Sequence, residues 1–391
     1  MTEAEPPAVV PRLPAFTTAH SHAFQRAMRG LAQRPGPTGT DDFWTWRKAM
    51  YELALGLTPE RIYEVSRVAF RELRSVGTLT VGEFHYLHHQ ADGTPYAQRT
   101  LLSDAVIEAA LAEGLRISLL RTIYHRAGAG KPPAGAQKRF SDASLDDALS
   151  DVEALLARWR GHPDVRIGIA PHSVRAVPPS WLAPIGAFAR EHDLPLHMHV
   201  AEQPGEVTAC LEETGKRPLR LIAEAGLLGP RFVAVHGTHL GADEAIALGK
   251  SGGFVCINAT TERDLGDGHP DLQALRVAGV RICNGIDSHV ATDPFEEMRG
   301  PELGERLRTL RRVTDRTTTP TLAERLWASA STEGAIAVGF SDAGGHVEID
   351  LEHPCLALVA PSHLLDALVF SGRPDVVRGI TRSPAREQPL P

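Results

Sequence analysis

The stretch AFTTAHSH, residues 15–22, joins a β-prone run to two histidines that stand one residue apart. Alternate residues of a β-strand share a face, so His20 and His22 can direct two imidazoles at one point. Imidazole is a preferred ligand of zinc-type cations. Because the chain holds 18 histidines, such a pair also arises by chance, and its meaning depends on what the rest of the chain supplies.

Strand-like runs recur along the chain, and most of them are followed by a helical stretch such as residues 144–160 or 218–225. Several runs are apolar throughout, which is typical of parallel strands covered on both faces. Eight strands spread over roughly 270 residues match the length of a (β/α)8 barrel. The eight runs are Ala15–Ala19, Leu79–Phe84, Arg116–Ile123, Val165–Ala170, Leu194–Val200, Phe232–Val235, Gly253–Asn258 and Val280–Ile286.

Polar side chains mark the ends of many of these strands, and their distribution separates two fold classes. An open, doubly wound sheet concentrates its functional groups at one switch point. A barrel instead gathers them at one mouth from many strand ends. We therefore predict an α/β protein with a (β/α)8 TIM barrel. The residues at strand ends are His20, His22, Glu83, Tyr86, His172, His199, Glu202, His236 and Asp287.

Four of these residues form a candidate metal site. A zinc-type cation takes nitrogen and carboxylate ligands, and a catalytic site leaves one position open for water. The predicted ligands are His20, His22, His199 and Asp287. His197 and His199 form a second His-x-His pair, and we choose His199 because Glu202 then lies near the metal-bound water. His197 is interpreted as a packing residue.

The composition gives no electrostatic reason to expect a nucleic acid or a membrane as partner, because the net charge is −7. No apolar run approaches the ~20 residues of a membrane span. The acidic, proline-broken N-terminus does not read as a secretory signal. Four cysteines without C-x-x-C spacing predict neither a disulfide framework nor a cysteine zinc site. We expect a cytoplasmic protein.

The order of the polar residues resembles the amidohydrolase superfamily, with His-x-His after the first strand and an aspartate after the eighth. Within it the chain is similar to the formimidoylglutamate deiminase family. The runs HSHAFQRAMRG (20–30) and GEFHYLHH (82–89) are highly specific, and the similarity covers residues 16–312. Further matching stretches are FWTWRKAMY, APHSVRAV, HMHVAEQ, VAVHGTHL, TTERDLGDG and GIDSHV.

The resemblance implies metal-dependent hydrolytic deamination of N-formimino-L-glutamate to N-formyl-L-glutamate and ammonia, a step of histidine degradation. A metal-bound hydroxide would attack the C=N carbon, with Glu202 and His236 as catalytic partners and Asp287 taking the proton of the water. The resemblance also implies one Zn2+ per subunit, with another divalent metal such as Fe2+ left open, and a homodimer. The implied substrate-binding residues are Gln25, Arg47, Tyr86, His172 and Arg175.

The charge of the implied substrate indicates which residues could bind it. N-formimino-L-glutamate is a small anionic molecule with two carboxylates, and a guanidinium can grip a carboxylate through two parallel hydrogen bonds. Arg47 and Arg175 are the candidates for this role, and Tyr86 can add a hydroxyl. Arg175 is the stronger candidate because it follows His172 at a strand end.

The chain also departs from the family pattern. Little sequence precedes the first strand, and the chain ends soon after residue 378, so the β-sandwich that the family builds from both ends is expected to be reduced. We predict an N-terminal sandwich remnant over 1–15, a catalytic barrel over 16–335 and a C-terminal β appendage over 336–391. The loops NATTERD (258–264) and NGIDSH (284–289) replace the sequences that are usual in the family.

Two alternatives stay open at this point. The chain can be an aminohydrolase of the same superfamily that acts on a purine, pyrimidine or triazine. Such flat, neutral substrates favour an aromatic-lined pocket over two arginines. The chain can also be a non-catalytic descendant that serves as a binding protein, although every expected ligand and proton carrier is present.

Overall fold

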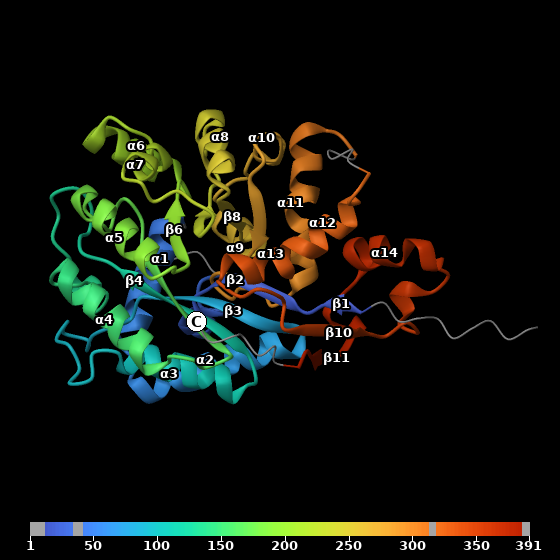
Figure 1. Ribbon diagram of the computed structural model, residues 1–391, viewed down its shortest axis with the longest axis horizontal. Coiled ribbons are helices and arrows are strands. Elements are labelled where there is room, and N and C mark those ends of the chain that lie inside the picture. Colours follow the sequence, from blue (N-terminus) through green and yellow to red (C-terminus); the bar gives the residue numbers. More distant parts are fainter. Residues whose placement is uncertain (1–11, 34–41, 313–317, 385–391) are drawn as a thin grey trace, which may run out of the picture.

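Eight parallel strands in sequence order form the centre of the molecule (Figure 1). The computed structural model describes residues 12–33, 42–312 and 318–384. Each strand pairs with the next one in the chain, which is the topology of a (β/α)8 barrel. The strands are β2 (Phe16–Ser21), β3 (Thr78–His85), β4 (Arg116–Ile123), β5 (Val165–Pro171), β6 (Leu196–Val200), β7 (Phe232–His236), β8 (Phe254–Ile257) and β9 (Arg281–Asn284).

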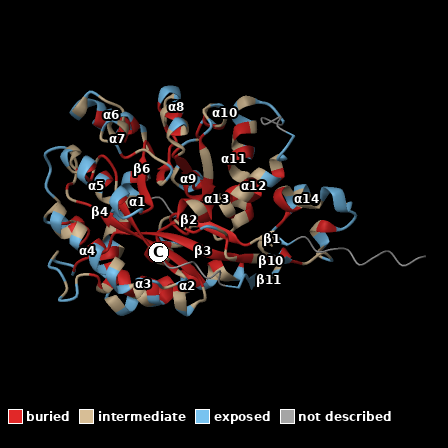
Figure 2. Ribbon diagram, viewed as in Figure 1, coloured by how far each residue is buried: buried red, intermediate tan, exposed pale blue. Residues whose placement is uncertain are grey.

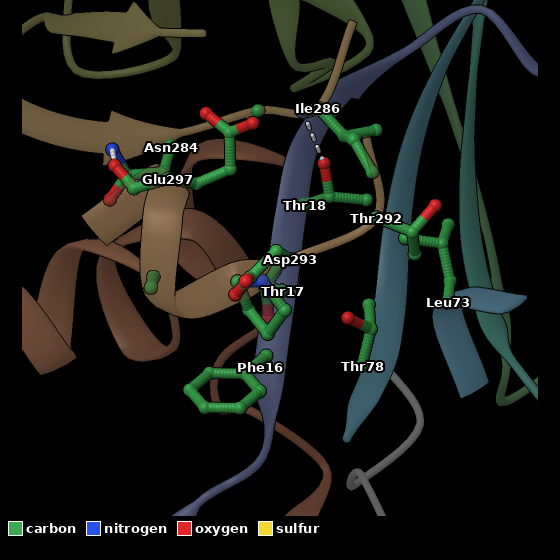
Figure 3. A pocket seen from close by; sticks show the side chains of 13 residues that line it. Phe16, Thr17, Thr18, Leu73, Thr78, Asn284, Ile286, Thr292, Asp293 and Glu297 are labelled. Carbon is green, nitrogen blue, oxygen red and sulfur yellow. Dashed lines mark hydrogen bonds between the residues drawn. The ribbon is translucent and has the colours of Figure 1, made fainter. Parts of the chain in front are cut away.

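The last strand meets the first at a seam that is nearly closed. Beyond β9 the chain returns to β2, where Ser21 and Asp287 form an isolated parallel bridge. The backbone N–H of Ile286 donates to the carbonyl of His20 at 2.9 Å. It lies 2.9 Å from the hydroxyl of Thr18 as well, as Figure 3 shows. The seam therefore carries Asp287 directly to the end of the strand that bears His20.

Helices surround the strands and leave the barrel interior buried (Figure 2). In α2 (Pro59–Ser75), the side chain of Thr58 accepts from Arg61 N–H and Pro59 occupies the first turn, two features that start a helix. The major helices of the barrel region are α1 (Phe43–Leu55), α2, α3 (Leu101–Ala112), α4 (Leu145–Arg158), α5 (Pro179–Glu191), α6 (Pro204–Thr214), α7 (Pro218–Glu224), α8 (Ala242–Ser251), α9 (Ala259–Leu265), α10 (Leu272–Val277), α11 (Pro294–Thr309), α12 (Leu322–Ser329) and α13 (Thr332–Ala337).

A separate three-stranded antiparallel sheet lies beside the barrel, at the right of Figure 1. Its strands are β1 (Leu13–Pro14), β10 (Gly345–Ile349) and β11 (Val377–Arg382), in the order β1-β10-β11. Residues from both ends of the chain thus share one small sheet. A second hydrophobic core joins it to α12 and to α14 (Leu364–Ser371).

The fold class predicted from the sequence is confirmed, including the small terminal β appendage. Each predicted strand run overlaps one observed barrel strand. The predicted boundaries 1–15, 16–335 and 336–391 stay predictions, and residues 1–11 and 385–391 lie outside the described residues. Within the described part of the chain, no helix is long and apolar enough to cross a membrane.

Candidate metal centre and active site

Three histidines and one aspartate converge at the mouth of the barrel. His20, His22, His199 and Asp287 each offer one ligand atom, and these atoms all lie within 4.8 Å of one another. The Nε2 atoms of His20 and His22 both lie 3.3 Å from Oδ1 of Asp287. All four residues are buried. The cluster joins the ends of the first, fifth and eighth barrel strands.

Main-chain contacts at the seam explain how Asp287 reaches the histidines. Asp287 N–H donates to the His20 carbonyl at 3.1 Å, and His22 N–H donates to the Asp287 carbonyl at 2.9 Å. Gly285 allows this approach, because a Cβ there would lie 2.7 Å from the Cβ of His20 and 2.2 Å from Oδ1 of Asn258. Asp287 itself has a φ of +54°, a left-handed conformation that costs an aspartate free energy and that persists where surrounding contacts enforce it.

The ring orientations leave free nitrogens directed at the cluster. Nδ1 of His22 lies 2.8 Å from the carbonyl of Phe84, and Nδ1 of His199 lies 3.0 Å from the carbonyl of His172. A ring nitrogen beside a carbonyl carries the proton, so Nε2 of each ring keeps its lone pair. Burial lowers the pKa of His20 to about 3 and also lowers the pKa of His22 and His199. Neutral rings are the form that binds a metal.

The four residues fit a resident divalent cation. Both ring nitrogens of His20 are buried and lack a hydrogen-bond partner within the described residues. A buried polar atom without a partner is costly, and a metal ion would satisfy it. Three imidazole nitrogens and one carboxylate oxygen are ligands that a zinc-type ion accepts. Three of the four residues, His22, His199 and Asp287, also line a cavity, so the cluster lies where a small molecule could reach it.

His236 and Glu202 stand next to the cluster. Nε2 of His236 lies 3.8 Å from Oε1 of Glu202 and 3.6 Å from Oδ2 of Asp287. Burial raises the pKa of Glu202, although His236 acts in the opposite sense. Burial alone would lower the pKa of His236, but the carboxylates of Glu202, Glu262 and Asp287 outweigh it and raise that pKa to about 10. A carboxyl group and an imidazole that can carry protons therefore lie directly beside the cluster.

Glu262 is a neighbour of this group that the sequence did not single out. Its Oε1 lies 3.2 Å from Nδ1 of His236, on the side of the ring that faces away from Asp287. Glu262 belongs to α9, which begins directly after the seventh barrel strand. The position of an acidic residue within NATTERD could have suggested it, but only the fold shows that α9 turns this side chain inward.

The predicted substrate residues line one cavity above the cluster. Nε2 of Gln25 donates to the hydroxyl of Tyr86 at 2.8 Å, and Oε1 of Gln25 is buried without a partner within the described residues. The guanidinium of Arg175 lies 4.0 Å from Glu206. Ten predicted residues share the cavity lining, while His20 lies beneath it. The ten are His22, Gln25, Arg47, Tyr86, His172, Arg175, His199, Glu202, His236 and Asp287.

Arg47 reaches the cavity from α1 and is held by two tyrosines that the sequence analysis did not identify. Its Nε donates to the hydroxyl of Tyr51 at 2.6 Å, and its Nη2 donates to the hydroxyl of Tyr124 at 3.3 Å. The ring of Tyr51 also lies under the guanidinium, 5.1 Å from its centre. The wall is thus aromatic as well as cationic. Its aromatic residues are Phe43, Trp46, Tyr51, Tyr86, Tyr124 and Phe140.

Two other features fall outside this site. His197 is buried, and its Nε2 lies 2.9 Å from the carbonyl of Ala337 on α13, away from the cluster. This contact agrees with its interpretation as a packing residue. A small cavity at the seam, drawn in Figure 3, is lined mostly by apolar groups and threonines, with the carboxyl groups of Asp293 and Glu297 and no histidine.

Comparisons with known proteins agree with the fold. A model of the amidohydrolase family matches residues 12–380. A formimidoylglutamate deiminase from Pseudomonas aeruginosa is 37% identical over 379 residues, which cover 94% of this chain and 82% of that protein. An 8-oxoguanine deaminase from the same organism is 29% identical over 287 residues, 72% of this chain and 60% of that protein.

A solved structure of an amidohydrolase has a similar fold. The crystal structure of an amidohydrolase from Brucella melitensis superposes with a TM-score of 0.84 at 32% identity, covering 93% of this chain and 84% of that one. The chain belongs to the amidohydrolase family. The roles assigned to individual site residues stay predictions.

Proposed function

We propose that this protein hydrolyses the C=N bond of N-formimino-L-glutamate and releases ammonia, with N-formyl-L-glutamate as the other product. The observation that carries the proposal is the placement of two arginines, Arg47 and Arg175, in the wall of a cavity whose floor is the three-histidine and aspartate cluster. The similarity to a formimidoylglutamate deiminase over 94% of this chain supports the same substrate. The activity belongs to hydrolases that act on C–N bonds other than peptide bonds.

The residues of the chain divide the chemistry between them. A cation in the cluster would supply a water whose pKa is lowered to about 7. Asp287 and His236 would face that water from two sides, and Asp287 would be placed to accept its proton as oxygen adds to the formimino carbon. Glu202 would carry both protons of the water to the terminal nitrogen, the second one from the hydroxyl of the adduct, so that the bond from carbon to this nitrogen breaks, ammonia leaves and the C=O bond forms. The glutamate nitrogen stays bound to the new formyl group.

The arginines orient the substrate. A carboxylate bound by a guanidinium places the rest of a short molecule at a fixed distance, and such positioning lowers the activation barrier. Arg175 projects from the loop after β5 and Arg47 from α1, so the two carboxylates of the substrate can be bound separately. Tyr86 and Gln25 add a hydroxyl and an amide near His22.

We propose zinc as the resident metal, one ion per subunit. Three neutral imidazoles and one carboxylate match its ligand preference. Ferrous iron accepts the same donors, so the identity is decided by elemental analysis of protein purified without added metal. One equivalent of zinc would support the proposal, and one equivalent of iron would change only the identity of the metal. If neither zinc nor iron binds, the metal site is contradicted.

The activity is tested by measuring ammonia release from N-formimino-L-glutamate. N-formimino-L-aspartate, guanine, 8-oxoguanine and cytosine serve as comparison substrates, and metal content is determined on the same sample. We expect the highest kcat/KM with N-formimino-L-glutamate. A higher kcat/KM with a nucleobase would contradict the proposal, and a metal-loaded protein inactive on all five compounds would favour a binding protein.

A second candidate has a specific observation in its favour. The cavity is lined by six aromatic side chains as well as by the arginines, and aromatic faces suit flat heterocycles. The similarity to an 8-oxoguanine deaminase points the same way, although it covers 72% of this chain. We rank this candidate second because Tyr51 and Tyr124 use their hydroxyls to hold Arg47.

We further propose that the protein acts as a homodimer in the cytoplasm, as the family resemblance implies. Leu303 and Leu307 lie one helical turn apart on α11 with exposed side chains, and Leu310 is exposed at its end. Clustered exposed leucines are typical of contact surfaces. Light scattering at micromolar concentration tests the assembly, and a monomer would contradict it. Imaging of the protein expressed in its own cell tests the compartment.

A further inference from the structure

We propose that Glu262 is a positioning residue that keeps a proton on Nδ1 of His236 and so fixes what the opposite nitrogen, Nε2, can do. This inference rests on the proposed role of His236 in the reaction. Two side chains compete for Nδ1 among the described residues. Oε1 of Glu262 and Nδ2 of Asn258 each lie 3.2 Å from it.

The two competitors demand opposite states of the ring. A carboxylate accepts hydrogen bonds, so Glu262 requires a proton on Nδ1. The amide nitrogen of Asn258 donates, so a hydrogen bond from it to Nδ1 would need a bare lone pair there. The same nitrogen also donates to the carbonyl of Cys256 at 3.4 Å. His236, Glu262 and Asn258 are all buried. Little water is therefore available to bond with whichever of Glu262 and Asn258 does not bond to Nδ1. The choice of partner therefore decides where the ring carries its proton.

The choice has a chemical consequence at Nε2, which faces Glu202 and Asp287. With Nδ1 donating to Glu262, a neutral ring has its lone pair on Nε2, which can then accept a hydrogen bond as well as face the two carboxyl groups. With Nδ1 accepting from Asn258, Nε2 would have to keep its proton, since losing it would leave an imidazolate. Glu262 thus decides whether Nε2 of His236 can accept a hydrogen bond or can only donate one.

Glu262 is fixed by a second contact of its own. Its Oε1 also accepts the backbone N–H of Asn258 at 2.9 Å, so the oxygen that faces His236 cannot easily turn away. The first turn of α9 is anchored as well, because Thr260 donates its hydroxyl to Glu297 on α11. The hydroxyl of Thr261 accepts from Ser288 N–H at 3.1 Å.

These anchors connect Glu262 to the metal cluster. Ser288 directly follows Asp287, and the hydroxyl of Thr261 also donates to the carbonyl of Ile286, which precedes it. The same short helix therefore holds the carboxylate beside His236 and the backbone on both sides of Asp287. The loop NATTERD, residues 258–264, supplies Asn258, the two threonines and Glu262 from one segment.

The decisive experiment locates the proton directly. The zinc-loaded protein is labelled with 15N at its histidine rings, and long-range 1H–15N spectra report the protonation of each ring nitrogen. Loss of signals in a His236→Gln variant identifies His236. We expect Nδ1 of His236 to carry a proton in the unmodified protein at pH 7. An unprotonated Nδ1 there would overturn the proposal, whatever the activity of the protein.

Two substitutions of Glu262 sharpen the result. Glu262→Met removes the acceptor and keeps a similar size. We then expect Nδ1 to be unprotonated and to accept a hydrogen bond from Asn258. We expect kcat to fall about 10–100-fold, in the range of other partners that orient site histidines, with KM and zinc content little changed. Glu262→Gln keeps an oxygen for Asn258 N–H and for Nδ1. It should retain the proton and lower kcat by about tenfold at most.

A matched control lies one residue further along α9. Arg263 has an exposed side chain that pairs with Glu296, and Arg263→Gln should leave the His236 spectrum and kcat unchanged. Equal losses in Arg263→Gln and Glu262→Met would show that α9 matters only structurally and would overturn the proposal. If the protein proves inactive on formimino substrates, the spectra still decide the role of Glu262.

Discussion

The floor and the wall of the cavity are built in different ways. The floor consists of His20, His22, His199 and Asp287, which lie at strand ends. Main-chain hydrogen bonds across the seam tie Asp287 to His20 and His22, and His199 is bonded to His172. The wall consists of Arg47, Tyr51, Tyr124 and Arg175, which come from α1 and from loops beyond the strands. Arg47 is held by the side chains of the two tyrosines, while Arg175 lies beside Glu206.

The difference assigns separate tasks to the two regions. Atoms attached to strands of a closed barrel move little, so the floor keeps its geometry whatever the loops contain. Side chains on helices and loops at the mouth can be exchanged without disturbing the barrel. We therefore infer that the floor determines the class of reaction and the wall determines the substrate.

The largest effect is expected from the floor, with Asp287→Asn. The substitution removes the negative charge that faces two of the histidines and the acceptor of the proton from water. We expect metal affinity to fall and ammonia release to drop to the assay background. Elemental analysis and a turnover assay on the same sample test this. Full metal content with unchanged kcat would show that Asp287 is neither a metal ligand nor the proton acceptor.

Glu202→Gln should give the next largest effect, a fall in kcat of about 10²–10⁴-fold, because a proton carrier is lost. Zinc content should stay unchanged, since Glu202 is not among the clustered ligands. The amide keeps the size of the side chain, so packing is preserved. A kcat within a factor of two of the parent protein would exclude Glu202 from proton transfer.

The wall is tested by Arg175→Met. Hydrogen bonds to a charged group contribute about 1.5–3 kcal/mol, so KM for N-formimino-L-glutamate should rise by about 10–100-fold. A substrate analogue with both carboxylates converted to amides serves as the control and should be affected much less. Equal losses on the two compounds, or loss of zinc, would break the division between floor and wall.

The smallest effect is expected from Tyr124→Phe, which removes one acceptor from the guanidinium of Arg47. A single hydrogen bond contributes about 0.5–1.5 kcal/mol, which corresponds to a rise in KM of about 2–10-fold. The hydroxyl also accepts from Gln137 at 2.9 Å, so the melting temperature is measured in parallel. A change in kcat without a change in KM would place Tyr124 closer to the chemistry than the wall.

The floor was more predictable from the sequence than the wall. His20 and His22 lie at positions that share one face of a strand, and His199 and Asp287 follow apolar runs that end at the same mouth. Arg47 was named from a resemblance, and its two tyrosine partners were missed. Tyr124 has no local signal, because it follows β4 while Arg47 lies on α1. Tyr51 lies four residues after Arg47 on α1, and this i,i+4 spacing could have suggested it.

Glu262, which lies beside His236, was also not predictable from the sequence. Glu262 is an ordinary acidic residue in the sequence, and its burial beside an imidazole depends on how α9 is tied to α11 and to the backbone around Asp287. No periodicity or spacing encodes that arrangement. It follows from packing between elements that are brought together only when the barrel closes.

The sequence by itself determined the alternation of strands and helices, and it placed the candidate ligands at strand ends. Both follow from hydrophobic periodicity and from which residues are neighbours in the chain. The tertiary structure decided the rest. It brought Asp287 to His20 across the seam, turned Glu262 toward His236 and placed the hydroxyl of Tyr124 beside Arg47. These contacts join residues that are far apart in the chain, and closure of the barrel fixes their distances.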